Sequence, residues 1–207
     1  MNLDTTHLFA IAAALGWASG LRLYAVVFLT GLAGHLGWVE LPSGLRVLQQ
    51  PIMLWASGGM LAVEFLADKV PWVDSLWDAV HTFIRIPAGA ALAYGVFGGD
   101  QSTWATVAAL LGGTLAATAH TAKATTRAAA NTSPEPFSNI ALSLAGDALV
   151  PGMLWLSWEH PLLFYVALAV ALIVMVVVTV LLFKFLRGLG RRLRGHFMPT
   201  RLNAGGG

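Results

Sequence analysis

Apolar residues dominate this chain in long stretches that short groups of polar residues interrupt. The longest uncharged stretch covers residues 161–183, which is 23 residues. At about 1.5 Å per residue such a helix crosses a hydrocarbon core of about 30 Å. Less regular stretches predict further helices by the same criterion. Together the predicted helices cover residues 8–33, 51–67, 86–98, 102–120, 138–157 and 161–186.

The third predicted helix is the shortest, because its apolar run from Ile86 to Phe97 is only about a dozen residues. It either re-enters the membrane as a half-helix or is completed as a span by the turn before Pro87. Residues 72–85, just before it, predict a separate amphipathic helix that Pro71 breaks from the second span. We expect this helix to lie at the cytoplasmic interface, with a hydrated polar face that carries Asp74, Asp78, His81 and Arg85.

Composition supports a membrane protein. The 207 residues are 57% hydrophobic and 11% charged, and their mean hydropathy is +0.72, which is typical of chains that cross membranes rather than of water-soluble domains. The predicted fold class is therefore all-α, a polytopic membrane protein with about six transmembrane helices. Residues 1–190 would form one transmembrane domain, whose halves, 1–98 and 99–190, suggest a 3+3 inverted repeat.

The distribution of Lys and Arg predicts the orientation of the chain. If the C-terminus is cytoplasmic and there are six spans, most of the basic residues lie on the cytoplasmic side and both termini are cytoplasmic. These residues are Lys69, Arg85, Lys123, Arg127, Lys184, Arg187, Arg191, Arg192, Arg194 and Arg201. We expect the basic tail, residues 191–207, to be largely disordered and to contact anionic lipid headgroups.

Glu64 and Asp68 lie on one face at the end of the second apolar helix. Ionised groups there are costly unless they are paired or hydrated, so both are candidates for an ion or proton pathway. The alternative is that they emerge at the interface beside Lys69. On the fourth helix His120, Lys123 and Arg127 share one face at the same cytoplasmic end. These bases either close a salt-bridge network with the acids or receive an anionic solute or lipid phosphate.

Arg22 lies near the middle of the first predicted helix, directly after Ser19-Gly20-Leu21, and Asp147 lies at a comparable depth in the fifth helix, after Gly146. A buried Arg22–Asp147 pair is therefore predicted. If the glycines open the backbone, both helices are discontinuous and bind a ligand at the midplane. Otherwise the pair only fixes the register of the two helices.

Asp74 and Asp78 are one helical turn apart and are the candidates for a divalent-cation site. No cofactor is otherwise predicted, because the chain lacks a Walker A loop, a nucleophile elbow, an H-E-x-x-H motif and a dinucleotide fingerprint. It also has no cysteine. Its basic tail has no aromatic interleaving suited to nucleic acid, so no such partner is expected.

Five segments together resemble a family of bacterial membrane proteins, domain of unknown function 4126. The segments are ASGLRLY at 18–24, EFLADKVPWVDSLWD at 64–78, IRIPAGA at 84–90, HTAKATTRAAANTSPEP at 120–136 and SLAGD at 143–147. The resemblance implies a multi-pass protein of the bacterial cytoplasmic (inner) membrane and implies no mechanism.

Three functions fit the sequence. A small-molecule or ion transporter or channel would use Glu64 or Asp68 for coupling and Arg22, Lys123 or Arg127 for an anionic group. A membrane-embedded, metal-dependent enzyme acting on lipid phosphates would use Asp74 and Asp78, although the preceding D-G-x-x-A-R element of CDP-alcohol phosphotransferases is missing. A non-transporting scaffold, or a homo-oligomer, would use small-residue runs such as residues 12–14 for helix packing. Transport is the preferred hypothesis.

Overall fold

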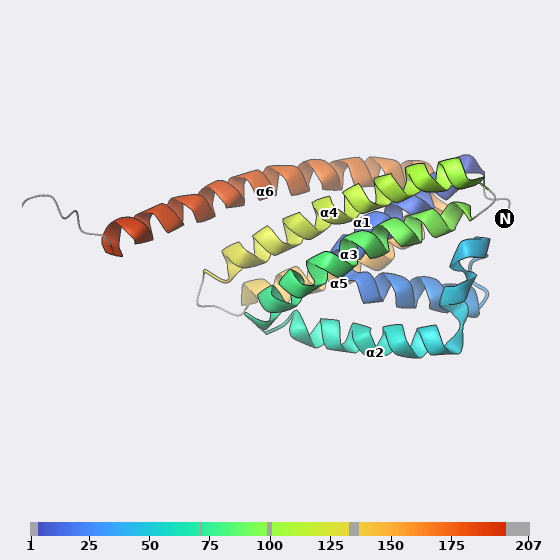
Figure 1. The fold of residues 1–207 in the computed structure, drawn as a ribbon, viewed down its shortest axis with the longest axis horizontal. Helices are drawn as coiled ribbons and strands as arrows, with labels where there is room; N and C mark the ends of the chain where they lie inside the picture. Colours follow the sequence, from blue (N-terminus) through green and yellow to red (C-terminus); the bar gives the residue numbers. More distant parts are fainter. Residues whose placement is uncertain (1–3, 71, 99–100, 133–136, 198–207) are drawn as a thin grey trace, which may run out of the picture.

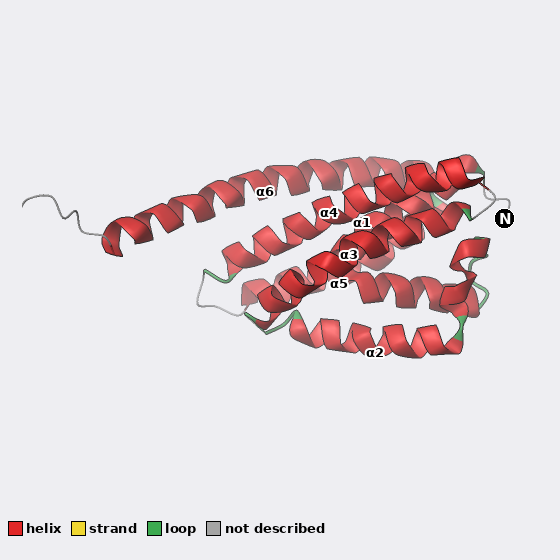
Figure 2. Ribbon diagram, in the orientation of Figure 1, coloured by secondary structure: helices red, strands yellow, loops and turns green. Residues whose placement is uncertain are grey.

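A computed structural model describes residues 4–70, 72–98, 101–132 and 137–197. These described parts are helical and contain no strand (Figure 2). The elements are α1 (Thr5–His35), the short 3₁₀ helix η1 (Ser43–Gln49), α2 (Pro51–Ala67), α3 (Val73–Phe97), α4 (Ser102–Ala130), α5 (Phe137–Glu159) and α6 (Pro161–Phe197). They form an elongated bundle in which α6 runs past the ends of its neighbours (Figure 1).

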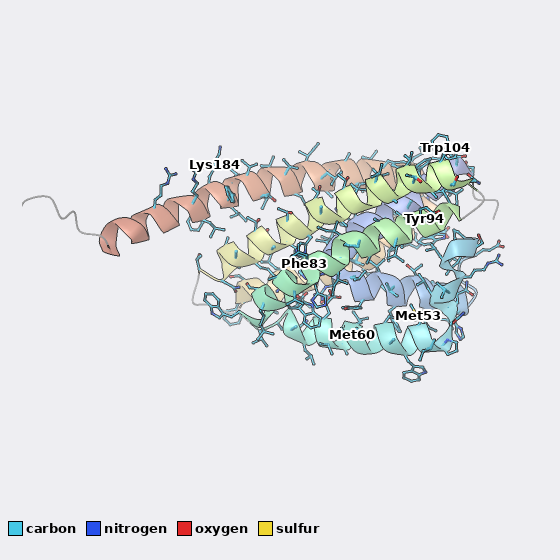
Figure 3. All side chains as sticks on the ribbon, in the orientation of Figure 1. Met53, Met60, Phe83, Tyr94, Trp104 and Lys184 are labelled. Atoms are coloured by element: carbon cyan, nitrogen blue, oxygen red, sulfur yellow. The ribbon has the colours of Figure 1, made fainter. Side chains whose placement is uncertain are left out.

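The outer surface of the bundle is apolar. By length and composition α1, α3, residues Ile140–Glu159 of α5 and residues Pro161–Gly188 of α6 can each cross a membrane, and α2 is a shorter apolar helix. On α6 the side chains of Val166, Val170 and Ile173 are more than half exposed. Such a surface is costly in water and suits lipid. Trp104 lies at one end of the bundle, and Lys184 lies toward the other end (Figure 3).

The helix α1 is broken at Arg22, whose backbone angles, φ −146° and ψ 81°, are not helical. A straight helix of 31 residues would be about 46 Å long, yet both ends of α1 lie at the same end of the bundle (Figure 1). Near its start, Phe9 packs on Phe97, with 4.8 Å between ring centroids. At its end, His35 binds the carbonyl of Gln49 at 3.1 Å. The two arms of α1 therefore form a hairpin whose apex is Arg22.

The remaining helices then run between two ends of the bundle. We call the end that holds the start of α1 the N end, and the end where α2 meets α3 and α4 meets α5 the network end. The start of α1 lies at the N end, whereas α6 finishes beyond the network end (Figure 1). The sequence predicts both termini on one side of the membrane, whereas the start of α1 and the end of α6 lie at opposite ends of the bundle, because the second arm of α1 returns to the N end.

The helix α3 is longer than the third helix that the sequence predicts. Residues 73–97 form one continuous helix, α3, that includes Pro87, so the separate interfacial helix and the short third helix are a single element. The side chains of Asp74, Asp78, His81 and Arg85 are buried in the bundle, and the apolar face, including Phe83, is exposed. The sequence correctly predicted which residues form the polar face. The prediction that water covers this face is wrong, because the polar face points into the bundle and the apolar face points outward.

Small residues bring α1, α3 and α4 close together. A Cβ atom on Gly16 would overlap the backbone of Gly112, and one on Gly20 would overlap the carbonyl of Ala116. The backbones approach so closely because neither glycine carries a side chain. This packing positions the apex of α1 beside the charged part of α4.

We expect Gly20→Val to destabilise the protein by about 3 kcal/mol, because a larger side chain must push α4 away from α1. Thermal unfolding in detergent, followed by circular dichroism, measures the loss. Gly59→Val on α2 is the matched control, since nothing lies within 4 Å of a Cβ atom there. Equal stability of the two variants would contradict the close packing.

The described chain is helical near both of its ends, and Asp4 caps the start of α1. Asp4 accepts hydrogen bonds from the backbone N–H of His7 at 2.8 Å and from the ring of His7. These bonds hold the pKa of Asp4 below its ordinary value, and the bond from the backbone N–H has the larger effect. The tail predicted to be disordered is helical as far as Phe197, and residues 198–207 are outside the described parts. The 3+3 inverted repeat stays a prediction.

Candidate functional site: a buried ion-pair network

Arg22 connects three helices at the apex of α1. Its guanidinium is 2% exposed. Nη1 lies 3.0 Å from the Asp68 carboxylate, just after α2, and Nε lies 3.0 Å from Asp147 on α5. Nη2 donates to the hydroxyl and the carbonyl oxygen of Ser143, at 2.8 and 3.1 Å. The predicted Arg22–Asp147 pair is present. Of the two discontinuities expected if the glycines open the backbone, the one in α1 is present, whereas α5 is a continuous helix through Gly146.

Asp68 is surrounded by cations. Its Oδ2 atom lies 3.0 Å from Arg22, 3.1 Å from Lys123 and 3.3 Å from Arg127, and its side chain is fully buried. Lys123 also donates to the carbonyl of Leu21 at 3.0 Å. The last carbonyls of a helix lack intrahelical partners, so this lysine also satisfies the backbone where the first arm of α1 ends.

Arg85, on α3, holds a second group of charges. Its Nη2 donates to Glu64 at 2.7 Å and its Nη1 to Asp78 at 2.6 Å. Lys123 lies 3.2 Å from Asp78 as well as beside Asp68. This shared lysine joins the charges around Arg85 to those around Asp68.

The network is completed by two pairs at its edges. Arg127 binds Asp74 at 3.1 Å, and Lys69 lies 3.9 Å from Asp147. We define the ion-pair network as these ten residues, five acids and five bases: Glu64, Asp68, Asp74, Asp78, Asp147, Arg22, Lys69, Arg85, Lys123 and Arg127. Burying a charge away from water is costly unless an opposite charge lies beside it. In this network the acids and bases are equal in number.

Two histidines border the network. The Nδ1 atom of His120 faces Arg85 at 3.4 Å and its Nε2 faces Thr82 at 2.7 Å. An arginine only donates, so Nδ1 of His120 accepts and Nε2 carries the proton. His81 stacks on Trp77, 4.0 Å between centroids, and its Nε2 lies 3.2 Å from the Tyr24 hydroxyl. His120 thus connects Arg85 to a neutral hydroxyl, whereas His81 contacts the neutral side chains of Tyr24 and Trp77.

The candidates chosen from the sequence lie together. Arg22, Glu64, Asp68, Lys123, Arg127 and Asp147 belong to the ion-pair network, and His120 lies against it. Sequence reasoning did not select Ser143, Tyr24 or Thr82, which bind network residues or the histidines. Ser143 lies four residues before Asp147, and this helical spacing was the signal that could have indicated it.

Asp74 and Asp78 do not form the predicted cation site. Asp74 binds Arg127, and Asp78 binds Arg85 and Lys123, so each carboxylate is occupied by basic side chains. Within the described residues no group of three or more His, Cys, Asp or Glu side chains is arranged to hold a metal ion.

Three pockets lie along α1 and α5. The apex pocket, about 210 Å³, is bounded by Arg22, Asp68, Lys123 and Arg127 on one side and by apolar residues of α5 and α6 on the other. The groove pocket, about 600 Å³, lies between α1, α2 and α5 and also contains Arg22, with Asp147. The tryptophan pocket, about 400 Å³, shares Leu29 and Pro151 with the groove pocket and extends to Trp158 and Glu159. Arg22 thus separates two pockets, and a third continues toward the N end.

An all-helical bundle with an apolar exterior and a buried charged interior defines the class of the protein, one whose apolar helices are suited to a membrane. The chain belongs to the family described as domain of unknown function DUF4126, whose match covers residues 9–180. Searches of curated proteins and of solved structures give no match. The family resemblance expected from the sequence motifs is confirmed.

Proposed function

We propose that the protein is a transporter or channel for small solutes, with its polar site at the ion-pair network. The observation that supports this most strongly is the position of Arg22, at the broken apex of α1 and between two pockets. Interrupted helices that end inside a membrane domain leave backbone groups free to bind ions and solutes, and many secondary transporters use them.

The route would follow α1 and α5. From the apex pocket a solute would pass Arg22 to the groove pocket, and then Leu29 and Pro151 to the tryptophan pocket. The Arg22–Asp147 pair, 3.0 Å apart, is the barrier on this route. A solute that competes for either partner would open it, because each charged group prefers to keep a partner when it is buried.

The orientation follows from the basic residues near the end of α6. Lys184, Arg187 and Arg191 lie beyond the uncharged stretch of residues 161–183, and such residues favour the cytoplasm. The network end would therefore face the cytoplasm and the N end would face the opposite side. This places the polar site in the cytoplasmic half, and the bacterial inner membrane remains the expected location.

Glu64 is the better candidate for proton coupling. Asp68 has three basic partners, so a proton on it would leave three buried cations without the anion that they share. Glu64 has one basic partner, Arg85, through Oε1, and its buried Oε2 atom has no hydrogen-bond partner. A proton on Glu64 would leave Arg85 paired with Asp78, so the network tolerates protonation there better than at Asp68.

Flux measurements with Leu29→Trp test the route. Purified protein is reconstituted in liposomes, and uptake of radiolabelled acetate, octanoate, phosphate and chloride is measured. The larger ring fills the junction between the groove and tryptophan pockets, so we expect flux to fall about tenfold or more, as a barrier increase of about 1.4 kcal/mol predicts.

Leu163→Trp is the matched control, because Leu163 is exposed on α6, away from the pockets. It should keep wild-type flux, and both variants should unfold at the wild-type temperature. Wild-type flux in Leu29→Trp would reject the route. Flux no greater than in empty vesicles for every probe would reject transport of these solutes.

A further inference from the structure

The apex pocket has two chemically different walls. Among its ionisable residues there are three bases, Arg22, Lys123 and Arg127, and a single acid, Asp68. The other acids that pair with these bases, Asp74, Asp78 and Asp147, do not line this pocket. On this side the neutral network therefore presents an excess of positive charge.

The charged wall also has hydrogen-bond donors that lack a partner. Arg127 is 2% exposed, and its Nε atom has no hydrogen-bond partner. The Nη1 atom of Arg22 lies 3.0 Å from Asp68 without hydrogen-bond geometry. Buried donors without partners are costly, and an oxyanion is the ligand that satisfies guanidinium groups best.

The opposite wall is apolar. It consists of Leu142 and Leu149 from α5 and of Val174, Met175 and Val178 from α6. An inorganic anion would leave this wall without contacts, whereas an alkyl group would bury it. The cavity, about 210 Å³, is many times larger than the roughly 10–15 Å³ that a single water needs, so it has room for an alkyl chain of several carbons.

We propose that the apex pocket binds an organic monoanion with a short alkyl chain, its carboxylate or phosphate head on Arg22, Lys123 and Arg127 and its chain against α6. This inference rests on the proposed function and names the class of solute that the protein would carry. The head competes with Asp68 for its three basic partners, so its arrival would loosen the Arg22 contacts that separate the pockets.

Calorimetric titration of the purified protein in a neutral detergent tests the proposal with a series of carboxylates. Affinity should rise about fourfold for each methylene from butyrate to hexanoate, as burial of alkyl surface predicts. Acetate, which lacks a chain, and octanol, which lacks the charge, should each bind at least tenfold more weakly than octanoate. Equal binding of octanol and octanoate would reject the anion site.

Two neighbouring residues of α6 provide the variants. Val178 lines the pocket, so Val178→Trp should weaken octanoate binding at least tenfold. Val177 is half exposed and does not line the pocket, so Val177→Trp should bind octanoate like the wild type. Neither residue belongs to the ion-pair network, so both variants should fold. Wild-type affinity in Val178→Trp would overturn the location of the site.

Lipid headgroups offer the same chemistry, and nanodiscs distinguish them from a free solute. Octanoate affinity should be equal in nanodiscs of phosphatidylcholine and in nanodiscs that also contain phosphatidylglycerol. A tenfold fall with phosphatidylglycerol would overturn the free solute and assign the pocket to a lipid. Octanoate binding without flux would reject transport and keep the site, whereas flux of other probes without octanoate binding would reject the site and keep transport.

Discussion

Asp68→Asn is expected to lower the free energy of unfolding by about 3–5 kcal/mol, the cost of leaving buried charges without a partner. The substitution preserves the size of the side chain and removes the charge that Arg22, Lys123 and Arg127 share. In a chain of this length the midpoint of thermal unfolding should fall by roughly 10 °C. Circular dichroism in detergent measures both quantities.

A second substitution separates charge from packing. Lys123→Met in the Asp68→Asn background removes one of the three cations, and Asp78 keeps Arg85 as its partner. The double variant should therefore be more stable than Asp68→Asn alone. Glu40→Gln, at an exposed acid outside the network, should change stability by less than about 0.5 kcal/mol. A similarly small effect of Asp68→Asn would show that the network is not a unit of stability.

Labelling of single cysteines should place both ends of α1 on one side of the membrane. The chain has no cysteine of its own, so each introduced thiol is read without background. Thr6→Cys and Leu36→Cys, on exposed residues at the two ends of α1, should react alike with a membrane-impermeant maleimide. Arg187→Cys, near the end of α6, should react only from the opposite side.

This experiment has an all-or-none outcome. Reaction of Thr6→Cys and Arg187→Cys from the same side would show that α1 crosses the membrane as one helix, and would reject the hairpin. Gln101→Cys provides a reference, since it precedes α4 at the N end and should label with Thr6→Cys. Permeabilised vesicles, in which every exposed thiol reacts, confirm that each introduced thiol is accessible.

Hydropathy located most of the helices but could not indicate the path of α1. The predicted second helix has the bounds of α2, and the fifth differs from α5 by one or two residues at each end. In α1, however, the apolar pattern is the same whether the helix crosses or folds back at Arg22. The difference lies in the backbone angles of one residue, and the close approach of Gly16 and Gly20 to α4 is a tertiary contact that periodicity cannot indicate.

Periodicity found the charged face of α3 but not its surroundings. A helix with a polar and an apolar face has the same sequence pattern at a wet interface and inside a membrane bundle. In this bundle Phe83 and Leu76 are exposed, as suits a surface that faces lipid, and Arg85 is buried. The depth of Arg22 and Asp147 predicted their pair, because buried charges need partners. Asp74 pairs with Arg127 and Asp78 pairs with Lys123, and both of these bases lie on α4. The sequence of α3 alone could not predict these pairs, because they depend on how α4 packs beside it.

The balance of the ion-pair network has an electrical consequence. Moving one elementary charge across a potential of 100 mV takes about 2.3 kcal/mol. With five carboxylates and five bases, rigid movement of the whole network along the field takes no net work. A membrane voltage would therefore neither favour nor oppose such a movement in the empty protein. Any current would have to come from the charge of the cargo or from a proton that accompanies it.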